Sequence, residues 1–192
     1  MSTKDRIIRI AMGGVSIALS FVLSQVKIFE LPQGGTVTPA ATLPLILYAL
    51  AFGPAWGLGV AFAFSLTQLI GGYILNFPQL MLDYVIGYTA YGLAGFGAIK
   101  NRVSNPLKNF AQTSLVKSIF LTILCFAVRC LSSVLSGVIF FSEYAGDANP
   151  WVYSITYNGS FLAVDMAIVI VIMFILHSIF KVAFGGGKKT EL

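Results

Sequence analysis

Long apolar runs with very few charges fill most of this chain, and they restrict it to one class of fold. Only 10% of the 192 residues are charged and the mean hydropathy is +0.88, whereas soluble domains carry about 25% charged residues. A transmembrane β-barrel would alternate apolar and polar residues in segments of about 10 residues, but these runs are continuous. We therefore predict an all-α integral membrane protein.

We expect a single domain, residues 1–192, with six spanning helices, because each span needs about 20 apolar residues. The expected spans lie at about residues 7–26, 40–53, 56–75, 80–99, 115–141 and 159–184. The second span is short, since Pro39 precedes it and Gly53-Pro54 ends it in a tight turn. We expect that span to be tilted, kinked or partly re-entrant.

Basic residues collect on one side of the predicted topology. Of the 12 lysines and arginines, all except Lys27 and Arg129 fall at the two termini or around the loop between spans four and five. The positive-inside rule then places both termini in the cytoplasm. The opposite side carries acidic residues, namely Glu30, Asp83, Glu143 and Asp147. This distribution explains the net charge of +5 without a nucleic-acid partner.

The connection predicted between the last two spans, Gly137–Ser160, is rich in aromatic residues. It contains Phe140, Phe141, Tyr144, Trp151, Tyr153 and Tyr157, interleaved with Glu143, Asp147 and Asn158. Aromatic faces beside carboxylates and an amide suit a small, flat, cationic ligand. The alternative is an interfacial aromatic belt, which is common in membrane proteins.

Other segments on the same side are also unusual. Residues 27–42 contain Pro32, Gly34, Gly35 and Pro39, so they cannot form a regular helix. This segment either folds over a site as a lid or is an ordinary connection. Asp83 lies about one turn inside span four, where a carboxylate either contacts a ligand or has a structural role at the helix start.

Arg129 and Asp165 are charges placed deep in spans five and six. Neither should be isolated in hydrocarbon, so we expect them to pair, with ligand or partner contact as the alternative. In span one, Gly14 and Ala18 are small residues one turn apart, which permits close approach of another helix, either internal or from a partner.

Motifs for several enzyme classes are absent from the sequence. It has no GxxxxGK[ST] phosphate loop, no HExxH motif, no nucleophile elbow and no His/Glu cluster for a metal. We therefore do not expect an enzyme, a metal site or a cofactor. The chain cannot hydrolyse ATP by the usual P-loop machinery.

Four segments together resemble a known family: KIFELPQGGTVT, GGYI followed by LDY, SGVIFFSEYA and NPWVYSITYNGS. They are similar to the thiamine-specific substrate-binding (S) components of energy-coupling factor (ECF) vitamin transporters, and the resemblance extends from the first span to the sixth. It implies a multi-pass protein of the prokaryotic plasma membrane that binds thiamine near the outer face. It also implies a transmembrane coupling protein and two cytoplasmic ATPases as partners, besides membrane lipid.

The resemblance implies a set of binding residues. The family's ligand contacts fall on Asp83, Tyr84, Gly137, Phe141, Tyr153 and Asn158, and its lid on Gln33, Gly34 and Gly35. Ser133 stands where many members have a ligand-facing histidine, and Gly35 where some have a loop aromatic. The family meets its coupling protein through small residues of the first helix. Ala11 fits that pattern and Val15 does not, so Gly14 and Ala18 are the alternative contacts.

Three functions therefore remain open at this stage. The leading one is uptake of thiamine, whose permanent positive charge suits an acidic, aromatic outer face. The second is an S-component for a related ring compound, a hydroxymethylpyrimidine or a vitamin B6 form, which the loss of a ring at Ser133 favours. The third is a stand-alone carrier that needs no ATPase.

Overall fold

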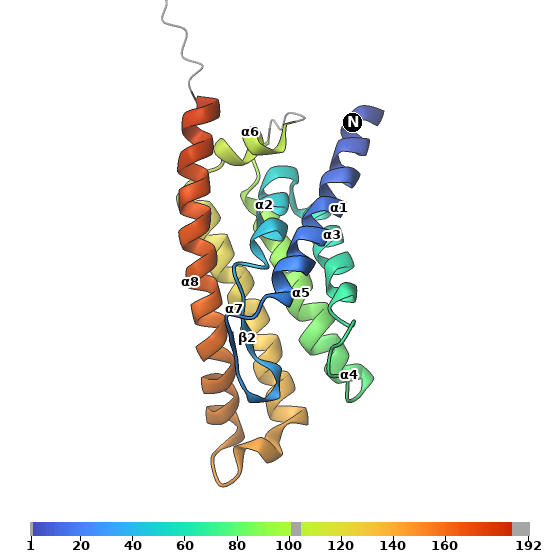
Figure 1. Cartoon of the computed structure of the whole chain (residues 1–192), viewed down its shortest axis with the longest axis vertical. Helices are drawn as coiled ribbons and strands as arrows, with labels where there is room; N and C mark the ends of the chain where they lie inside the picture. The colour runs from blue at the N-terminus through green and yellow to red at the C-terminus, as the bar shows by residue number, and fades with distance from the viewer. Residues whose placement is uncertain (1, 101–104, 186–192) are drawn as a thin grey trace, which may run out of the picture.

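The computed structural model describes residues 2–100 and 105–185, which form an elongated bundle of helices (Figure 1). The main helices are α1 (Thr3–Gln25), α2 (Leu43–Phe52), α3 (Pro54–Thr67), α7 (Leu115–Phe140) and α8 (Pro150–Gly185). A further helical rod is assembled from α4 (Phe77–Leu80), the π-helical turn η2 (Met81–Ile86), α5 (Gly87–Thr89) and the 3-10 segment η3 (Ala90–Gly97). The prediction of a mostly helical protein is confirmed.

Three of these helices are long and apolar enough to cross a membrane: α1, α7 and α8. The helices α2 and α3 are apolar but shorter, and Gly53 joins them with a positive φ of 93°, as the Gly-Pro turn predicted. Central packing explains why α2 is apolar on all sides. Its residues Ile46, Ala49 and Leu50 are completely buried, beside the buried rings of Phe64 and Tyr91.

Several boundaries differ from those expected. The last helix, α8, begins at Pro150 and not near residue 159, so the connection after α7 covers residues 141–149 and not 137–160. Asn149 accounts for this early start, because its Oδ1 accepts a hydrogen bond from the backbone N–H of Trp151 at 2.9 Å. Proline at the first helical position favours the same start. A short helix that we did not predict, α6 (Pro106–Ala111), precedes α7.

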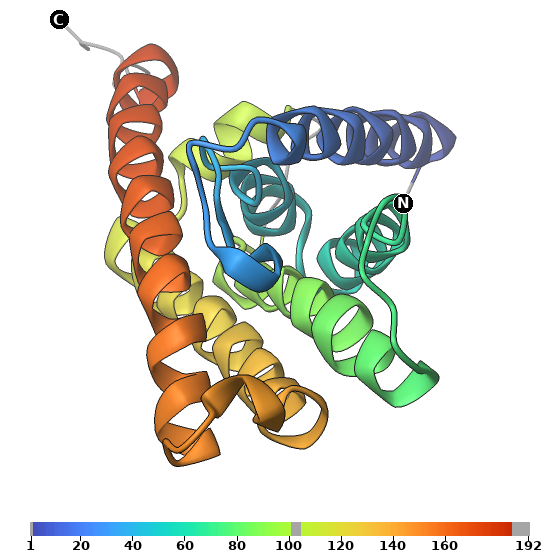
Figure 2. The same ribbon diagram turned by 60° about the horizontal axis from the view of Figure 1, so that its bottom comes forward.

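Residues 27–42 form a small hairpin. Strands β1 (Phe29–Glu30) and β2 (Thr36–Val37) pair antiparallel, and one 3-10 turn, η1 (Pro32–Gly34), joins them. The hairpin leaves the end of α1, and β2 packs against α8 (Figures 1 and 2). It lies toward the end of the bundle that holds the α7–α8 connection, away from α6 and the start of α1 (Figure 1).

Candidate functional site

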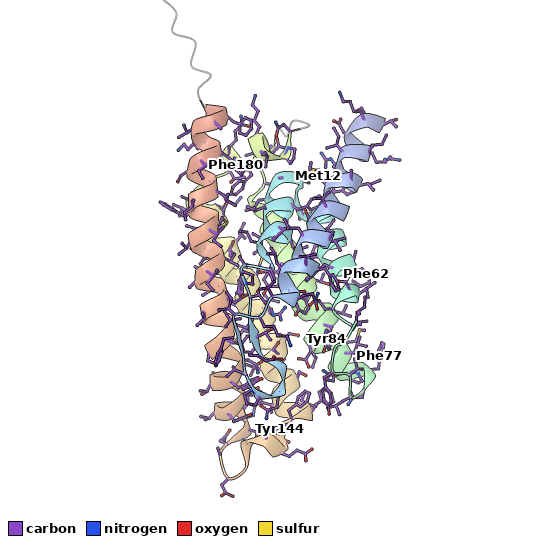
Figure 3. The ribbon with its side chains drawn as sticks, in the orientation of Figure 1. Met12, Phe62, Phe77, Tyr84, Tyr144 and Phe180 are labelled. Carbon is purple, nitrogen blue, oxygen red and sulfur yellow. The ribbon has the colours of Figure 1, made fainter. Side chains whose placement is uncertain are left out.

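A cavity of about 170 Å³ lies between the hairpin, the helical rod that contains η2, and the helices α7 and α8. It slightly exceeds the engineered cavity of about 150 Å³ that holds benzene, so it has room for a small ring compound. All of the predicted ligand-binding and lid residues line it: Gln33, Gly34, Gly35, Asp83, Tyr84, Ser133, Gly137, Phe141, Tyr153 and Asn158. Segments far apart in the sequence thus meet at one place, and Tyr84 lies in the same half of the bundle as Tyr144 (Figure 3).

Asp83 supplies a carboxylate to this cavity from the π-helical turn η2. Its Oδ2 accepts hydrogen bonds of 2.7 Å from the Gln79 amide nitrogen and the Ser136 hydroxyl. Gln79 is itself fixed, because its Oε1 accepts from the backbone N–H of Leu75 at 3.1 Å. A π-helical turn often marks a functional site, and here it belongs to the element that presents the carboxylate. The carboxylate is therefore held in place before any ligand arrives.

Aromatic rings form two walls of the cavity. On one side, Phe141 stacks on Tyr144 with ring centroids 6.2 Å apart, and the ring of Tyr73 lies at the same distance from Phe141. On the other side, Tyr153 and Tyr157 stack at 6.0 Å, one helical turn apart on α8. Such faces attract flat rings and cations. The arrangement suits a planar cation near a carboxylate.

The floor of the site depends on close contact between α7 and α8. Gly137 permits this contact, since a Cβ there would overlap the hydroxyl of Ser154. That hydroxyl donates to the carbonyl of Val134 at 2.9 Å. Asn158 donates from its amide nitrogen to the carbonyl of Ser154 at 3.0 Å and, more weakly, to the carbonyl of Ser133 at 3.4 Å. Among the described residues, no hydrogen bond uses its Oδ1, which can accept one from a ligand.

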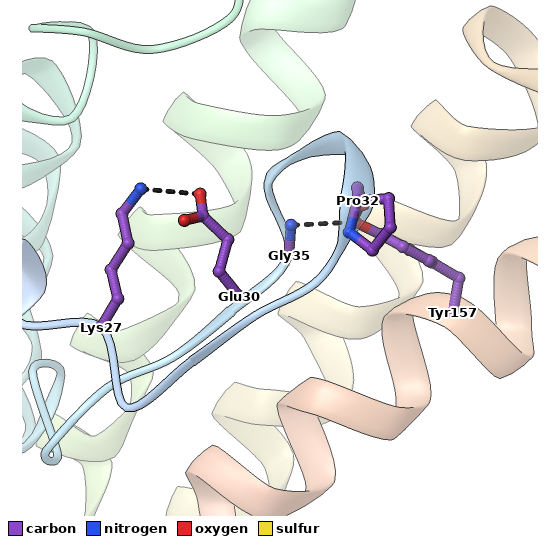
Figure 4. Close-up of polar contacts among 5 residues, drawn as sticks. All are labelled: Lys27, Glu30, Pro32, Gly35 and Tyr157. Carbon is purple, nitrogen blue, oxygen red and sulfur yellow. Dashed lines mark hydrogen bonds and ion pairs between the residues drawn. The ribbon is translucent and has the colours of Figure 1, made fainter.

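The hairpin is fastened over the cavity by Tyr157. The hydroxyl of Tyr157 accepts a hydrogen bond from the backbone N–H of Gly35 at 2.9 Å and donates one to the carbonyl of Pro32 (Figure 4). Gly35 allows this approach, because a Cβ there would lie 2.8 Å from the Tyr157 hydroxyl oxygen. Some family members have an aromatic side chain at the position of Gly35. In this protein, glycine has no side chain to place over the site, and its backbone N–H contacts Tyr157 of α8 instead.

The expected ion pair between Arg129 and Asp165 is not formed. Within residues 2–100 and 105–185, no nitrogen of Arg129 lies within 4.0 Å of an oxygen of Asp165. Asp165 accepts hydrogen bonds from the backbone N–H and the hydroxyl of Thr38 at 3.0 and 2.9 Å. The Arg129 guanidinium lies 3.7 Å from the ring centroid of Tyr88, a cation–π contact that partly replaces the expected ion pair.

Several lining residues were not predicted as site residues. They are Tyr73, Gln79, Tyr88, Ser154 and Phe161. Arg129, for which ligand contact was the alternative role, and Tyr144 and Tyr157 of the aromatic stretch also line the cavity, although they were not among the residues that the resemblance implied. The spacing of Tyr153 and Tyr157 on a helix could have revealed one of them, had the early start of α8 been foreseen. Conversely, Phe140 and Trp151 from the aromatic stretch do not line the cavity. Trp151 is 49% exposed, as expected for a belt residue.

The small residues of α1 that were predicted as partner contacts lie on its exposed surface. Ala11, Gly14 and Ala18 are exposed, and a Cβ at Gly14 would meet none of the described atoms within 4 Å. By contrast, the adjacent Gly13 is buried against Val60 and Tyr48. Close packing against other described residues therefore does not account for Gly14 and Ala18.

The family model described as "Thiamine transporter protein" matches residues 10–184, which is most of the chain. The chain belongs to the thiamine transporter protein family. Its resemblance to thiamine-specific transporters, expected from the loop motifs, is thereby confirmed.

Individual relatives of this family member agree with the match. It is 27% identical over 183 residues to the thiamine transporter ThiT of Bacillus subtilis, covering 92% of this chain and 93% of that protein. It is 26% identical over 149 residues to ThiT of Lacticaseibacillus paracasei, covering 71% of each. A solved structure of ThiT from Listeria monocytogenes has the same fold, with a TM-score of 0.76 at 20% identity over 93% of this chain and 98% of that one.

Proposed function

We propose that this protein binds thiamine at the cavity under the hairpin and takes it up across the membrane as the S-component of an ECF-type transporter. The observation that carries the proposal is one cavity that combines the fixed carboxylate of Asp83 with aromatic walls, in a member of the thiamine transporter protein family. Other proteins, and not this chain, would supply the energy.

The cavity matches the chemistry of thiamine in two respects. The thiazolium ring carries a permanent positive charge, which the aromatic faces of Phe141 and Tyr153 would attract. The aminopyrimidine ring offers an amine donor, for which Asp83 and the Oδ1 of Asn158 are acceptors. Residues 27–42 would close over the ligand as a lid, with Gln33, Gly34 and Gly35 at the cavity wall.

We further propose that six segments cross the membrane and that both termini face the cytoplasm. The basic residues of α1, α6 and the end of α8 are supporting evidence, since these elements lie at the same end of the bundle (Figure 1). The cavity and the acidic loop residues Glu143 and Asp147 belong to the opposite half, which would face outward.

The assembly with partners is also part of this proposal. A transmembrane coupling protein would pack on the exposed small residues Ala11, Gly14 and Ala18 of α1, and two cytoplasmic ATPases would drive it. The absence of a phosphate loop from this sequence is consistent with ATP hydrolysis by separate subunits.

Calorimetric titration of the detergent-purified protein with thiamine tests the function directly. We expect saturable binding that Asp83→Asn weakens about tenfold or more, because a hydrogen bond to a charged group contributes about 1.5–3 kcal/mol. Asp147→Asn is the matched control, since Asp147 is exposed and does not line the cavity. Calorimetry is preferable to tryptophan fluorescence because neither tryptophan lines the cavity.

Competition and uptake experiments separate the remaining alternatives. Saturable binding of a hydroxymethylpyrimidine or pyridoxine, with no binding of thiamine, would indicate that the ligand is a related ring compound. Ser133, in place of the family's histidine, favours this alternative. In proteoliposomes, uptake that requires the coupling protein and ATPases would support an S-component. Uptake by the purified chain alone would instead favour a stand-alone carrier.

A further inference from the structure

We propose that Asp165, which does not line the ligand cavity, makes that cavity selective for a cation by neutralising Arg129. This inference rests on the proposed binding of thiamine and extends it to a residue outside the predicted site. It assigns Asp165 as a positioning and specificity-determining residue and not as a ligand contact.

The geometric basis is a second, smaller cavity that shares a wall with the first. It has a volume of about 50 Å³ and lies beneath the base of the hairpin, where Asp165, Thr38, Thr42, Ser24 and Gln68 line it. Arg129 lines both cavities, as do Tyr88 and Phe161, and it is the charged residue of the three. A ligand in the first cavity and Asp165 in the second would thus both lie near Arg129.

Arg129 brings a positive charge to the site that hydrogen bonds satisfy only in part. Its Nε and Nη1 are inaccessible to solvent and have no hydrogen-bond partner among the described residues. Its charge is balanced instead by the ring of Tyr88 and by the two carboxylates of Asp83 and Asp165, which interact with it electrostatically without forming an ion pair. A cationic ligand placed beside an unbalanced guanidinium would be repelled strongly in this low-dielectric setting.

Asp165 is held in position to provide this balance. Asp165 is 6% exposed, and both hydrogen bonds that its carboxylate accepts from the described residues come from Thr38 at the base of the hairpin. Hydrogen bonds donated to a carboxylate stabilise its ionised form. The second cavity leaves space between Asp165 and Arg129 for water, which can connect the two charges without direct contact.

The sum of charges around the two cavities gives the selectivity. With both carboxylates ionised, Asp83 and Asp165 contribute one negative charge each and Arg129 one positive charge, so the described lining residues carry a net charge of −1. A ligand with a charge of +1 completes neutrality, whereas a neutral ligand leaves one buried charge unmatched. Without Asp165 the remaining two charges cancel, and a cationic ligand becomes the unmatched charge.

The test measures the affinities of two ligands for the full-length protein by calorimetry. One is thiamine and the other its thiophene analogue, which has the same shape but no charge. We expect Asp165→Asn to weaken thiamine binding about tenfold while the affinity for the neutral analogue stays within about threefold, as removal of one partly screened charge predicts. The double variant Arg129→Gln/Asp165→Asn returns the net charge to −1 and should restore the preference for thiamine.

Thr38→Val is the matched control for a purely structural role. It removes the hydroxyl hydrogen bond to Asp165 but leaves the one from the backbone N–H of Thr38, which keeps the carboxylate charged and in place, so any change should be equal for the two ligands. Equal losses of affinity for the two ligands in Asp165→Asn would overturn this inference, and so would a double variant that does not regain the preference for thiamine. Either result would leave the proposed function standing. If the wild-type protein does not bind thiamine, the proposed function fails and this inference with it. Should Asp165→Asn not fold, Arg129→Gln decides, since it must increase the preference for thiamine.

Discussion

At the scale of single residues, Gly137 shows how the site depends on contact between two helices. It lies where α7 meets α8, and a Cβ would overlap the Ser154 hydroxyl, which also anchors Asn158 at 3.2 Å. We expect Gly137→Ala to push the two helices apart at a cost of about 1–3 kcal/mol, the usual range for overpacking. Thiamine affinity should fall about tenfold, and the melting temperature of the purified protein should fall with it.

Gly159→Ala provides the control for this prediction. Gly159 lies in α8 as well, but a Cβ there would meet nothing within 4 Å among the described atoms. Alanine is favoured over glycine inside a helix by up to about 1 kcal/mol, so we expect unchanged affinity and equal or higher stability. Unchanged thiamine binding in Gly137→Ala would mean that the α7–α8 contact does not shape the cavity.

Residues with unusual chemistry for their place in the sequence were predictable, and those with ordinary chemistry were not. A carboxylate near an apolar run identified Asp83 without any structure, and the loop motifs identified its neighbours at the cavity. Nothing in the sequence distinguishes Gln79, which holds that carboxylate, from other polar residues near a helix start. Arg129 and Asp165 were recognised as unusual, but their partners lie on other elements, so the simplest pairing was wrong.

At the scale of elements, hydrogen bonds from Tyr157 join the hairpin to α8. Among the described residues, only Tyr157 has a side chain that hydrogen-bonds both Pro32, in the turn η1, and Gly35, directly after it. Tyr157→Phe keeps the ring that stacks on Tyr153 and removes both hydrogen bonds, each contributing about 0.5–1.5 kcal/mol. We expect bound thiamine to dissociate about tenfold faster, measured by displacement of labelled ligand, with a smaller change in the association rate.

Lys27→Ala tests whether any disturbance of the hairpin would have the same effect. Lys27 pairs with Glu30 at 2.7 Å, but both side chains are about half exposed (Figure 4). Exposed pairs of this kind contribute only about 0–1 kcal/mol, so we expect no change in the dissociation rate. Equal acceleration in both variants would indicate general loosening of the hairpin and not a specific fastening by Tyr157.

The positions of most helices were predictable because continuous apolar runs indicate them. The residues at which the helices begin and end were not predictable in this way. Local hydrogen bonds decide where a helix begins, and the cap at Asn149 starts α8 before the apolar run does. The π-helical turn at η2 is another feature set by packing, since it presents Asp83 to Ser136 on α7. Such contacts cannot be predicted from composition, because they join segments that are distant in sequence.

At the scale of the whole molecule, charge separates the two ends of the bundle. The basic starts of α1 and α7 and the helix α6 lie at one end, and the hairpin and the acidic α7–α8 connection lie toward the other (Figure 1). A membrane protein with this distribution should insert with its basic end in the cytoplasm, because loops rich in lysine and arginine are retained there. The ligand cavity would then open toward the outside, as uptake requires.

Single-cysteine labelling tests this orientation. In a background with Cys125 and Cys130 replaced by alanine, we expect Asp147→Cys to react with a membrane-impermeant maleimide on intact cells. Gln112→Cys, just after α6, should react only after permeabilisation. Both sites are exposed in the fold, so access across the membrane alone decides their reactivity. The reverse pattern would place the cavity on the cytoplasmic side, and uptake by capture at the outer face would then be impossible for this protein.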